Sequence, residues 1–446
     1  MNPNVFREYD VRGVVGNDLN EDFVFNLGRA IGTYATRYSI TKMTIGRDCR
    51  LSSNDYHHFL IKGLNCSGIE TIDIGLCATP MLYFSIRHLK NVEGGVMITG
   101  SHNPPEFNGF KICIGNDTIY GEKIQELRKI MESGQYVTGI ASSSFQDITT
   151  AYQNYLFDNV KITRKIKVVV DAGNGVGGHF ALPILQRYGC KVIPIYCEPD
   201  GHFPNHFPDP TVEENLTELI KIVREQKADL GIAFDGDADR LGVISDKGEI
   251  IWGDKLLLLF AREILKEKPN STIIGEVKCS QTLYDDIKKH SGRAIMWKAG
   301  HSLIKAKMKE EKAVLGGEMS GHLFFADRYF GYDDAIYAAI RLLEILSQTG
   351  QKISELLADV PQTFATPEIR IDCADDKKAQ VVERIKKHFQ NNPGLIEIDG
   401  VRIPFDDGWA LVRSSNTQPV IVLRFEASSA SSLRKIRNEV ENLIII

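Results

Sequence analysis

Apolar residues along the chain follow two periods, one typical of buried strands and one typical of amphipathic helices. Val168–Val170 and Leu230–Phe234 are short, continuously apolar runs, whereas Asp22–Tyr38 and Lys255–Lys266 place apolar residues at helical spacing. Short apolar runs that alternate with helices predict parallel strands joined by crossover helices. We therefore expect an α/β protein with mixed, mostly parallel sheets.

This strand–helix pattern occurs three times before it changes. Val137–Thr149 has no periodicity and is expected to link the first unit to the second. Beyond Phe364–Pro367 the pattern predicts a smaller α+β domain that contains the long strand Val420–Ala427. Its short strands are expected at Ile396–Ile398, Val401–Phe405 and Trp409–Val412. The predicted domains are residues 1–146, 147–253, 254–365 and 366–446.

Composition narrows the class of protein. A chain of 446 residues exceeds the size of one hydrophobic core, and its net charge of −5 provides no basic surface for nucleic acid. The 8 cysteines include no Cys-x-x-Cys pair, which favours free thiols in a reducing compartment. The first residues do not resemble a signal peptide, and no apolar run is long enough to cross a bilayer. We expect a cytoplasmic protein that binds neither nucleic acid nor a membrane.

One serine follows an apolar run that ends at Ile98, within the segment Thr99-Gly100-Ser101-His102-Asn103-Pro104. Proline and small residues end the strand and leave the Ser101 hydroxyl at its edge. A serine is a poor nucleophile without a base, a metal ion or a bound phosphoryl group. Neighbours in an extended chain point to opposite faces, so His102 is expected to orient the loop or contact a phosphate. The alternative is a capping serine in a polar loop.

Three carboxylates, Asp235, Asp237 and Asp239, directly follow a buried strand. Acids at this spacing repel one another unless a hard divalent cation lies between them, which predicts a Mg²⁺ site. A calcium-binding EF loop would need glycine and glutamate where Arg240 and Asp246 stand. An aspartyl phosphatase pattern fits the first two acids but meets Asp239 where threonine or valine belongs. A solvated acidic turn is the remaining alternative.

Two later loops carry groups suited to a phosphosugar. Glu318, Ser320 and His322 alternate, so in an extended loop all three would face the hydroxyls of one sugar. Arg413–Pro419 gathers a guanidinium, hydroxyls, an amide and backbone donors, which suit a phosphate dianion. Polar loops without a ligand are the alternative for both. The glycines of Ala172–Gly178 fit a dinucleotide fingerprint poorly and indicate tight-turn packing.

Four of these motifs, in this order and one per predicted domain, resemble the α-D-phosphohexomutase family. They are Thr-Gly-Ser-His-Asn-Pro, Asp-Gly-Asp-Ala-Asp-Arg, Gly-Glu-Met-Ser-Gly-His and Arg-Ser-Ser-Asn-Thr-Gln-Pro. The resemblance covers the whole chain, from Phe6–Asp10 to the last domain. Gly100 and Met319 are similar to the bacterial phosphomannomutase/phosphoglucomutase branch, because the glucosamine branch usually has alanine and glutamine there.

The resemblance implies four domains around a central cleft and an isomerase that interconverts hexose 1-phosphate and hexose 6-phosphate, with mannose as the first choice of sugar and glucose as the second. A phosphoserine at Ser101 would give its phosphoryl group to the sugar, with hexose 1,6-bisphosphate as intermediate and activator. Mg²⁺ would be held by Ser101, Asp235, Asp237 and Asp239.

The resemblance also assigns roles to residues that carry weaker signals of their own. Lys111 and His322 would be the general acid and base, Arg240 would support the phosphoserine, and His102 is counted with them among the catalytic residues. The substrate-binding residues would be Tyr9, Arg12, Lys278, His301, Glu318, Ser320, His322, Arg413, Ser415, Asn416 and Thr417.

Three alternatives to this function stay open. A phosphoglucosamine mutase would use the same residues on another sugar, whereas a metal-dependent sugar phosphatase would use Asp235 as nucleophile and release phosphate. A sugar-phosphate-binding protein would bind without turnover. In each case the partners expected are small sugar phosphates, and the chain is expected to be a monomer or a weak homo-oligomer.

Overall fold

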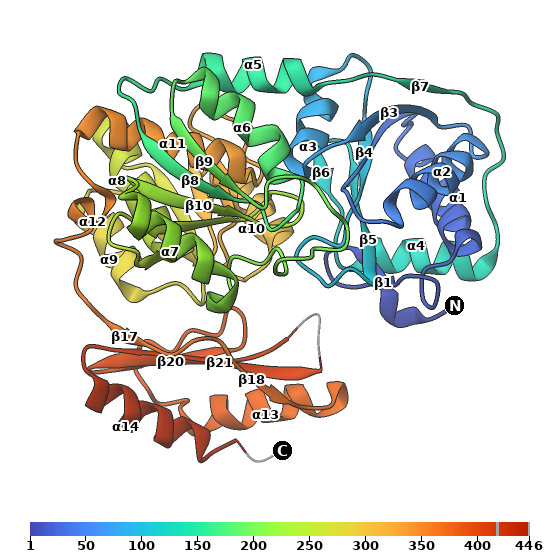
Figure 1. The fold of residues 1–446 in the computed structure, drawn as a ribbon. Helices are drawn as coiled ribbons and strands as arrows, with labels where there is room; N and C mark the ends of the chain where they lie inside the picture. Colours follow the sequence, from blue (N-terminus) through green and yellow to red (C-terminus); the bar gives the residue numbers. More distant parts are fainter. Residues whose placement is uncertain (416–418, 445–446) are drawn as a thin grey trace.

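Four sheets organise the described part of the chain, residues 1–415 and 419–444 of the computed structural model (Figure 1). The first sheet has the order β1-β5-β4-β2-β3-β7, with β6 beside β5. Its strands are β1 (Val11–Val14), β2 (Lys42–Arg47), β3 (Glu70–Leu76), β4 (Gly94–Ile98), β5 (Phe107–Ile114), β6 (Asp117–Thr118) and β7 (Ser143–Phe145). Its helices are the 3-10 turn η1 (Pro3–Val5), α1 (Glu21–Thr36), α2 (Ser53–Asn65), α3 (Thr79–His88) and α4 (Glu122–Ser133).

The second and third sheets repeat a plan of parallel strands with an antiparallel edge. Their orders are β12-β11-β10-β8-β9 and β14-β13-β15-β16. The second unit contains α5 (Thr149–Asn159), β8 (Lys167–Asp171), α6 (Gly177–Arg187), β9 (Lys191–Ile195), η2 (Glu213–Leu216), α7 (Thr217–Gln226), β10 (Leu230–Phe234), β11 (Leu241–Ser245) and β12 (Ile250–Ile251). The third contains α8 (Gly253–Glu267), β13 (Thr272–Glu276), α9 (Gln281–Lys289), β14 (Arg293–Trp297), α10 (His301–Glu311), β15 (Leu315–Gly317), β16 (Leu323–Phe325), α11 (Ala335–Thr349) and α12 (Ile353–Leu356).

The fourth unit is smaller, and its sheet is antiparallel. The order is β17-β21-β20-β19, with β18 also paired to β21. Its elements are β17 (Phe364–Ala365), β18 (Ile369–Asp372), α13 (Asp375–His388), β19 (Val401–Phe405), β20 (Gly408–Ser414), β21 (Val420–Ala427) and α14 (Ala430–Glu441). Helices α13 and α14 cover the face of this sheet that points away from the other domains (Figure 1). The predicted class, three mixed-sheet α/β domains followed by a small α+β domain, is confirmed, while the exact domain boundaries stay predictions.

The hydrophobic cores do not follow the four sheets one by one. The largest cluster of buried residues runs from Ile72 in the first unit to Val360 in the third. A second cluster, from Val5 to Ile130, belongs to the first unit alone. The fourth unit has its own cluster, from Cys373 to Val440. The first three units therefore share a core that the fourth does not enter.

The structure differs from the predicted elements in several places, and three of these differences have a clear local cause. The strand predicted at Ile396–Ile398 is wrong, because only an isolated bridge between Ile396 and Arg402 forms there and a tight turn follows. The link Val137–Thr149 contains β7, an exposed edge strand whose polar residues lack the apolar pattern of a strand. Helix α6 begins with two glycines and contains Pro183, which hides its helical pattern.

Candidate active site

Ser101 lies in the loop after β4, where Arg50 holds the backbone. The φ of Ser101 is 51°, a left-handed conformation that is uncommon for a residue with a side chain, and the residue is buried. Arg50 Nη2 donates to Ser101 O at 2.8 Å, and Nη1 donates to Pro104 O at 2.6 Å and to Phe107 O at 2.8 Å. The prolines end the strand ladder, and the guanidinium satisfies the carbonyls that the ladder leaves free.

The Ser101 hydroxyl meets the acidic loop that follows β10. Ser101 Oγ donates to Asp235 Oδ2 at 2.8 Å. A Cβ atom at Gly236 would lie 2.3 Å from Ser101 O, so the glycine is needed for this approach of the two loops. Asp235 Oδ1 accepts from the backbone N–H groups of Asp239 and Arg240 at 3.0 and 3.1 Å, which folds the acidic loop into a compact turn. The candidate nucleophile and a carboxylate thus meet across a domain junction.

The three predicted carboxylates form a buried group. Asp235, Asp237 and Asp239 are at most 1% exposed, and their ligand atoms lie within 4.8 Å of one another. Burial and the charge of Asp239 raise the pKa of Asp235. Lys111 Nζ pairs with Asp237 Oδ2 at 2.7 Å and also with Asp239 Oδ2. Although burial opposes it, this ammonium lowers the pKa of both carboxyls.

These residues fit a hard divalent cation. Asp237 Oδ1 is buried and has no hydrogen-bond partner among the described residues. An unpaired carboxylate oxygen inside a cluster of three acids is costly unless a cation or a further donor reaches it. Oxygen ligands of this kind suit Mg²⁺. The donor set is therefore consistent with the predicted metal site.

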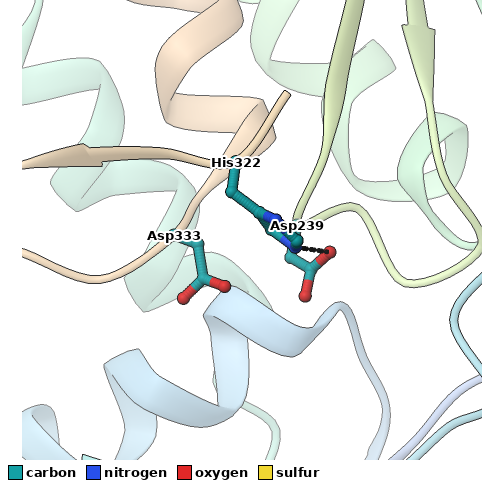
Figure 2. Close-up of side chains that lie close together, drawn as sticks. All are labelled: Asp239, His322 and Asp333. Atoms are coloured by element: carbon teal, nitrogen blue, oxygen red, sulfur yellow. Dashed lines mark ion pairs between the residues drawn. The ribbon is translucent and has the colours of Figure 1, made fainter. Parts of the chain in front are cut away.

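His322 lies between two carboxylates on the other side of this group. Its Nε2 is 3.2 Å from Asp239 Oδ1, and its Nδ1 is 2.8 Å from Glu318 Oε2. Burial opposes the imidazolium, but the two carboxylates raise the pKa of His322 to about 9. Figure 2 shows its ring beside Asp239, with Asp333 nearby on a separate segment. Asp333 Oδ1 accepts from Lys305 Nζ at 3.0 Å, and Asp333 Oδ2 lies 3.5 Å from His301 Nδ1.

The predicted sugar-binding loop has a different shape from the expected one. Glu318–His322 is a tight turn between β15 and β16, in which Glu318 N donates to His322 O at 2.9 Å and Gly321 has a φ of 94°. The expectation of an extended loop is therefore wrong. The three side chains still converge, because Ser320 Oγ lies 3.2 Å from His322 Nδ1. An isolated bridge between Arg240 and His322 joins this turn to the acidic loop.

His102 and Arg240 flank the serine and acidic loops. His102 Nδ1 lies 2.8 Å from Asp209 Oδ2, in a loop of the second domain. Burial and the nearby Arg240 guanidinium lower the pKa of His102 to about 4. Arg240 Nε lies 3.4 Å from His322 Nε2. His102 is therefore neutral and is held by Asp209, and its predicted role of orienting the loop or contacting a phosphate stays a prediction.

Tyr9 and Arg12 bring the start of the chain to the same region. Tyr9 Oη donates to Ala299 O at 2.9 Å, and its ring centroid is 5.8 Å from that of His301. Arg12 pairs with Asp10 at 2.6 Å and donates to Asn103 Oδ1 at 2.8 Å. Arg12 therefore contacts the serine loop directly.

Lys278 and Arg413 lie where the third and fourth domains meet. Lys278 Nζ is 3.3 Å from Glu368 Oε2, and Arg413 Nη2 is 3.0 Å from Asp399 Oδ2. Ser415 N donates to Val420 O at 3.0 Å, which closes the base of the predicted phosphate loop. The predicted residues Asn416 and Thr417 lie outside the described residues.

Four side chains that shape this region were not predicted from the sequence. They are Arg50, Asp209, Asp333 and Asp399, each a single charged residue without a motif around it. Only Asp209, between two prolines, stands in a stretch whose composition predicts a fixed turn.

In the part of the chain that the structure describes, none of the helices combines the length and the apolar character that a membrane span requires.

Comparison with known families gives a match along nearly the whole chain. Phosphoglucomutase/phosphomannomutase α/β/α domains I, II and III match residues 3–137, 146–248 and 252–364, and the C-terminal domain of the same family matches residues 368–443.

Similar proteins cover the chain from end to end. A phosphomannomutase/phosphoglucomutase of Pseudomonas aeruginosa is 46% identical over 98% of this chain and 95% of its own length. A phosphoglucomutase of Neisseria gonorrhoeae is 45% identical over 99% of this chain and 96% of its own. The crystal structure of a phosphoglucomutase/phosphomannomutase family protein from Burkholderia thailandensis superimposes with a TM-score of 0.95 at 38% identity, covering 99% and 97% of the two chains.

Proposed function

Because this chain belongs to the phosphoglucomutase/phosphomannomutase family, we propose that it interconverts hexose 1-phosphate and hexose 6-phosphate, with the mannose and glucose pairs as its substrates. One observation carries the proposed mechanism: Ser101 Oγ donates to Asp235 Oδ2 at 2.8 Å, inside a group of three buried acids. A serine held in this way is suited to accept and return a phosphoryl group.

Ser101 would carry the phosphoryl group between turnovers. In the first half-reaction a sugar hydroxyl attacks the phosphorus, the bond from phosphorus to Ser101 Oγ breaks, and hexose 1,6-bisphosphate forms. In the second half the other phosphoryl group moves to Ser101 Oγ, and the sugar oxygen that carried it leaves as a hydroxyl. In the first half the attacking sugar hydroxyl loses its proton and the serine oxygen gains one, and in the second half the serine hydroxyl loses its proton and the sugar oxygen gains one.

His322 and Asp235 are placed for these two proton tasks. His322 in its neutral form would take the proton of the attacking sugar hydroxyl in the first half and, once protonated, would donate to the leaving sugar oxygen in the second half, a role that its raised pKa favours. Asp235 Oδ2, which accepts from Ser101 Oγ, would supply the proton that the serine oxygen gains in the first half and take it back in the second. Lys111 was predicted as the partner of His322 in acid–base catalysis. Although burial opposes it, Asp237 and Asp239 raise the pKa of Lys111, so we propose that it instead stays charged near the transferred group. Asp235, Asp237, Asp239 and Ser101 would hold Mg²⁺, which when bound neutralises negative charge on the phosphoryl oxygens.

Both ends of the sugar must reach Ser101 in turn, so the distal phosphate must bind in two orientations of the substrate. Arg413 and Ser415 on the fourth domain would bind that phosphate. Glu318 and Ser320 would hold the sugar hydroxyls. The proposal extends to Tyr9, Arg12, Lys278 and His301 as further cleft residues, and to Asn416 and Thr417.

The test is turnover of the mannose and glucose phosphate pairs with Mg²⁺ and a trace of hexose 1,6-bisphosphate, for wild type and Ser101→Ala. Ser144→Ala, an exposed serine of the first domain, is the control. We expect turnover that depends on the bisphosphate and is lost in Ser101→Ala only. Phosphate release that survives Ser101→Ala would place the nucleophile at Asp235 and overturn the mutase mechanism. Preference for glucosamine phosphate would redirect the substrate assignment.

A further inference from the structure

Asp399 stands in a turn of the fourth domain that packs directly on Arg413. The turn is closed by paired backbone hydrogen bonds between Ile396 and Arg402, at 3.0 and 2.8 Å. Gly400, which follows Asp399, has a φ of 79°, and a Cβ atom there would lie 2.3 Å from Val412 O and 2.6 Å from Arg413 Cβ. The glycine therefore fixes the distance between the turn and the arginine.

One oxygen of Asp399 joins two domains. Asp399 Oδ2 lies 3.0 Å from Arg413 Nη2 and accepts from the backbone N–H of Ala299, in the third domain, at 3.1 Å. Both side chains of the ion pair are nearly buried, at 12% and 9% exposure. Charge-assisted hydrogen bonds of this kind are stronger than neutral ones when water is largely excluded.

The backbone that Asp399 contacts also carries the candidate sugar-binding carboxylate. Gly300, the next residue, donates its N–H to Glu318 Oε1 at 2.6 Å, and Ala299 O accepts from Tyr9 Oη at 2.9 Å. Two neighbouring peptide groups therefore contact the first, third and fourth domains. A shift of the fourth domain that moved Asp399 would act on the same backbone that orients Glu318.

Arg413 has a hydrogen-bond donor left over while it is paired with Asp399. Arg413 Nε is buried and has no hydrogen-bond partner among the residues that the structure describes. A buried guanidinium nitrogen without an acceptor is unfavourable, and an oxygen of a bound anion would satisfy it. With Nη2 fixed by the carboxylate, the planar group has one orientation in which to receive that anion.

We propose that Asp399 is a positioning residue, which fixes Arg413 for the distal phosphate of the substrate and ties the fourth domain to the backbone beside Glu318. This proposal rests on the proposed function, in which Arg413 binds that phosphate. Because one distal site serves both substrate orientations, loss of Asp399 weakens the binding of hexose 1-phosphate and the binding of hexose 6-phosphate by the same factor. The phosphoryl transfer at Ser101 is not touched by Asp399 directly.

The test compares Asp399→Ala and Asp399→Asn with the exposed Asp406→Ala as control. Calorimetry gives the Kd of glucose 1-phosphate and of glucose 6-phosphate, and steady-state assays give KM and kcat. We expect Asp399→Ala to raise both Kd values and both KM values about tenfold, with a smaller change in kcat. Asp399→Asn keeps an acceptor for Ala299 N–H but loses the charge, so it should fall between wild type and Asp399→Ala. Asp406→Ala should not change any of these values.

A double mutant separates positioning from general damage. If Asp399 acts through Arg413, Asp399→Ala adds less than twofold to the Kd of Arg413→Ala, and the urea midpoint of the first three domains stays close to that of wild type. Additive effects, or an effect on one phosphosugar only, would overturn the proposal. Binding without turnover in wild type would refute the mutase function but leave this test intact, whereas absence of hexose phosphate binding would refute both.

Discussion

The first three domains and the fourth domain are joined to their neighbours by different kinds of contact. A single cluster of buried apolar residues passes through the first three, from Ile72 to Val360. The fourth domain instead closes its own core, and its shared apolar cluster with the third is small, built on Val277, Trp409 and Leu411. Figure 1 shows the fourth domain as a separate layer below the other three. The contrast separates three domains that share an apolar core and hold Ser101 from a fourth domain that is docked on them by polar groups.

One buried carboxylate, Asp334, joins two of the three domains that share this core. Asp334 caps α11 by accepting from Tyr337 N at 2.8 Å, and it also accepts from the hydroxyls of Tyr329 at 2.8 Å and Tyr152 at 3.0 Å. Tyr152 belongs to the second domain and Asp334 to the third. Its neighbour Asp333 lies at the active site, so the apolar junction and the site share one segment.

The contact of the fourth domain with the third depends on Arg402 and Glu426. Arg402 Nη1 donates to Val277 O at 2.6 Å and to Cys279 O at 2.8 Å, and its guanidinium lies 3.7 Å from the centroid of Trp409. Glu426 Oε1 accepts from Trp409 Nε1 at 2.9 Å and from Ser280 Oγ at 3.0 Å. Water can replace polar contacts of this kind more easily than it can replace apolar packing. The attachment of the fourth domain therefore depends more on polar groups than the junctions among the first three domains do.

The largest expected effect is a loss of stability in the first three domains. Asp334→Ala removes a helix cap and leaves two buried tyrosine hydroxyls without their acceptor, so we expect the free energy of unfolding to fall by about 3 kcal/mol. Urea denaturation followed by circular dichroism measures it. Asp158→Ala, an exposed acid at the end of α5, should change the free energy little. Equal effects of the two substitutions would contradict the stabilising role of Asp334 as a helix cap and tyrosine acceptor.

A smaller effect is expected on the attachment of the fourth domain. Arg402→Ala leaves two buried carbonyls without a donor and removes the contact with Trp409, at a cost of about 2 kcal/mol to the interface. We expect a larger radius of gyration in solution scattering and faster proteolysis near residues 364–368, while the urea midpoint of the first three domains is unchanged. The control is Arg434→Ala, on the exposed face of α14. Loss of the whole fold in Arg402→Ala would show that the fourth domain is not separable from the first three.

The smallest effect concerns the pair of Lys278 and Glu368. Although burial opposes it, Lys278 and Arg370 lower the pKa of Glu368 to about 2 from an ordinary 4.5. A lowered carboxyl pKa stabilises the folded state above the unfolded pKa, and this contribution is lost as the pH falls from about 4.5 to about 2. Glu368→Gln should therefore lower the free energy of unfolding by about 1 kcal/mol at pH 7, and this difference should shrink as the pH falls through about 2. A difference between wild type and Glu368→Gln that does not shrink across this window would contradict the assignment.

Sequence alone predicted the parts of the site that occupy short continuous stretches. The grouping of Asp235, Asp237 and Asp239 was predictable because all three stand in one loop directly after a buried strand. Asp209, Asp333 and Asp399 were not, because each reaches its partner only through packing between domains. The same limit applies to the fold. Strands of continuous apolar residues were found, whereas β7 and α6 depend on neighbours that override weak local signals.

The contact between Ser101 and Asp235 also has a consequence for a chain during its synthesis. The two residues are 134 positions apart, and Lys111 is separated from Asp239 by 128. A ribosome therefore releases the serine well before it makes the acids that the serine loop contacts. An unfinished or truncated chain carries the hydroxyl without these partners, so the contact between Ser101 and Asp235 forms only in a molecule whose first two domains have both folded and met.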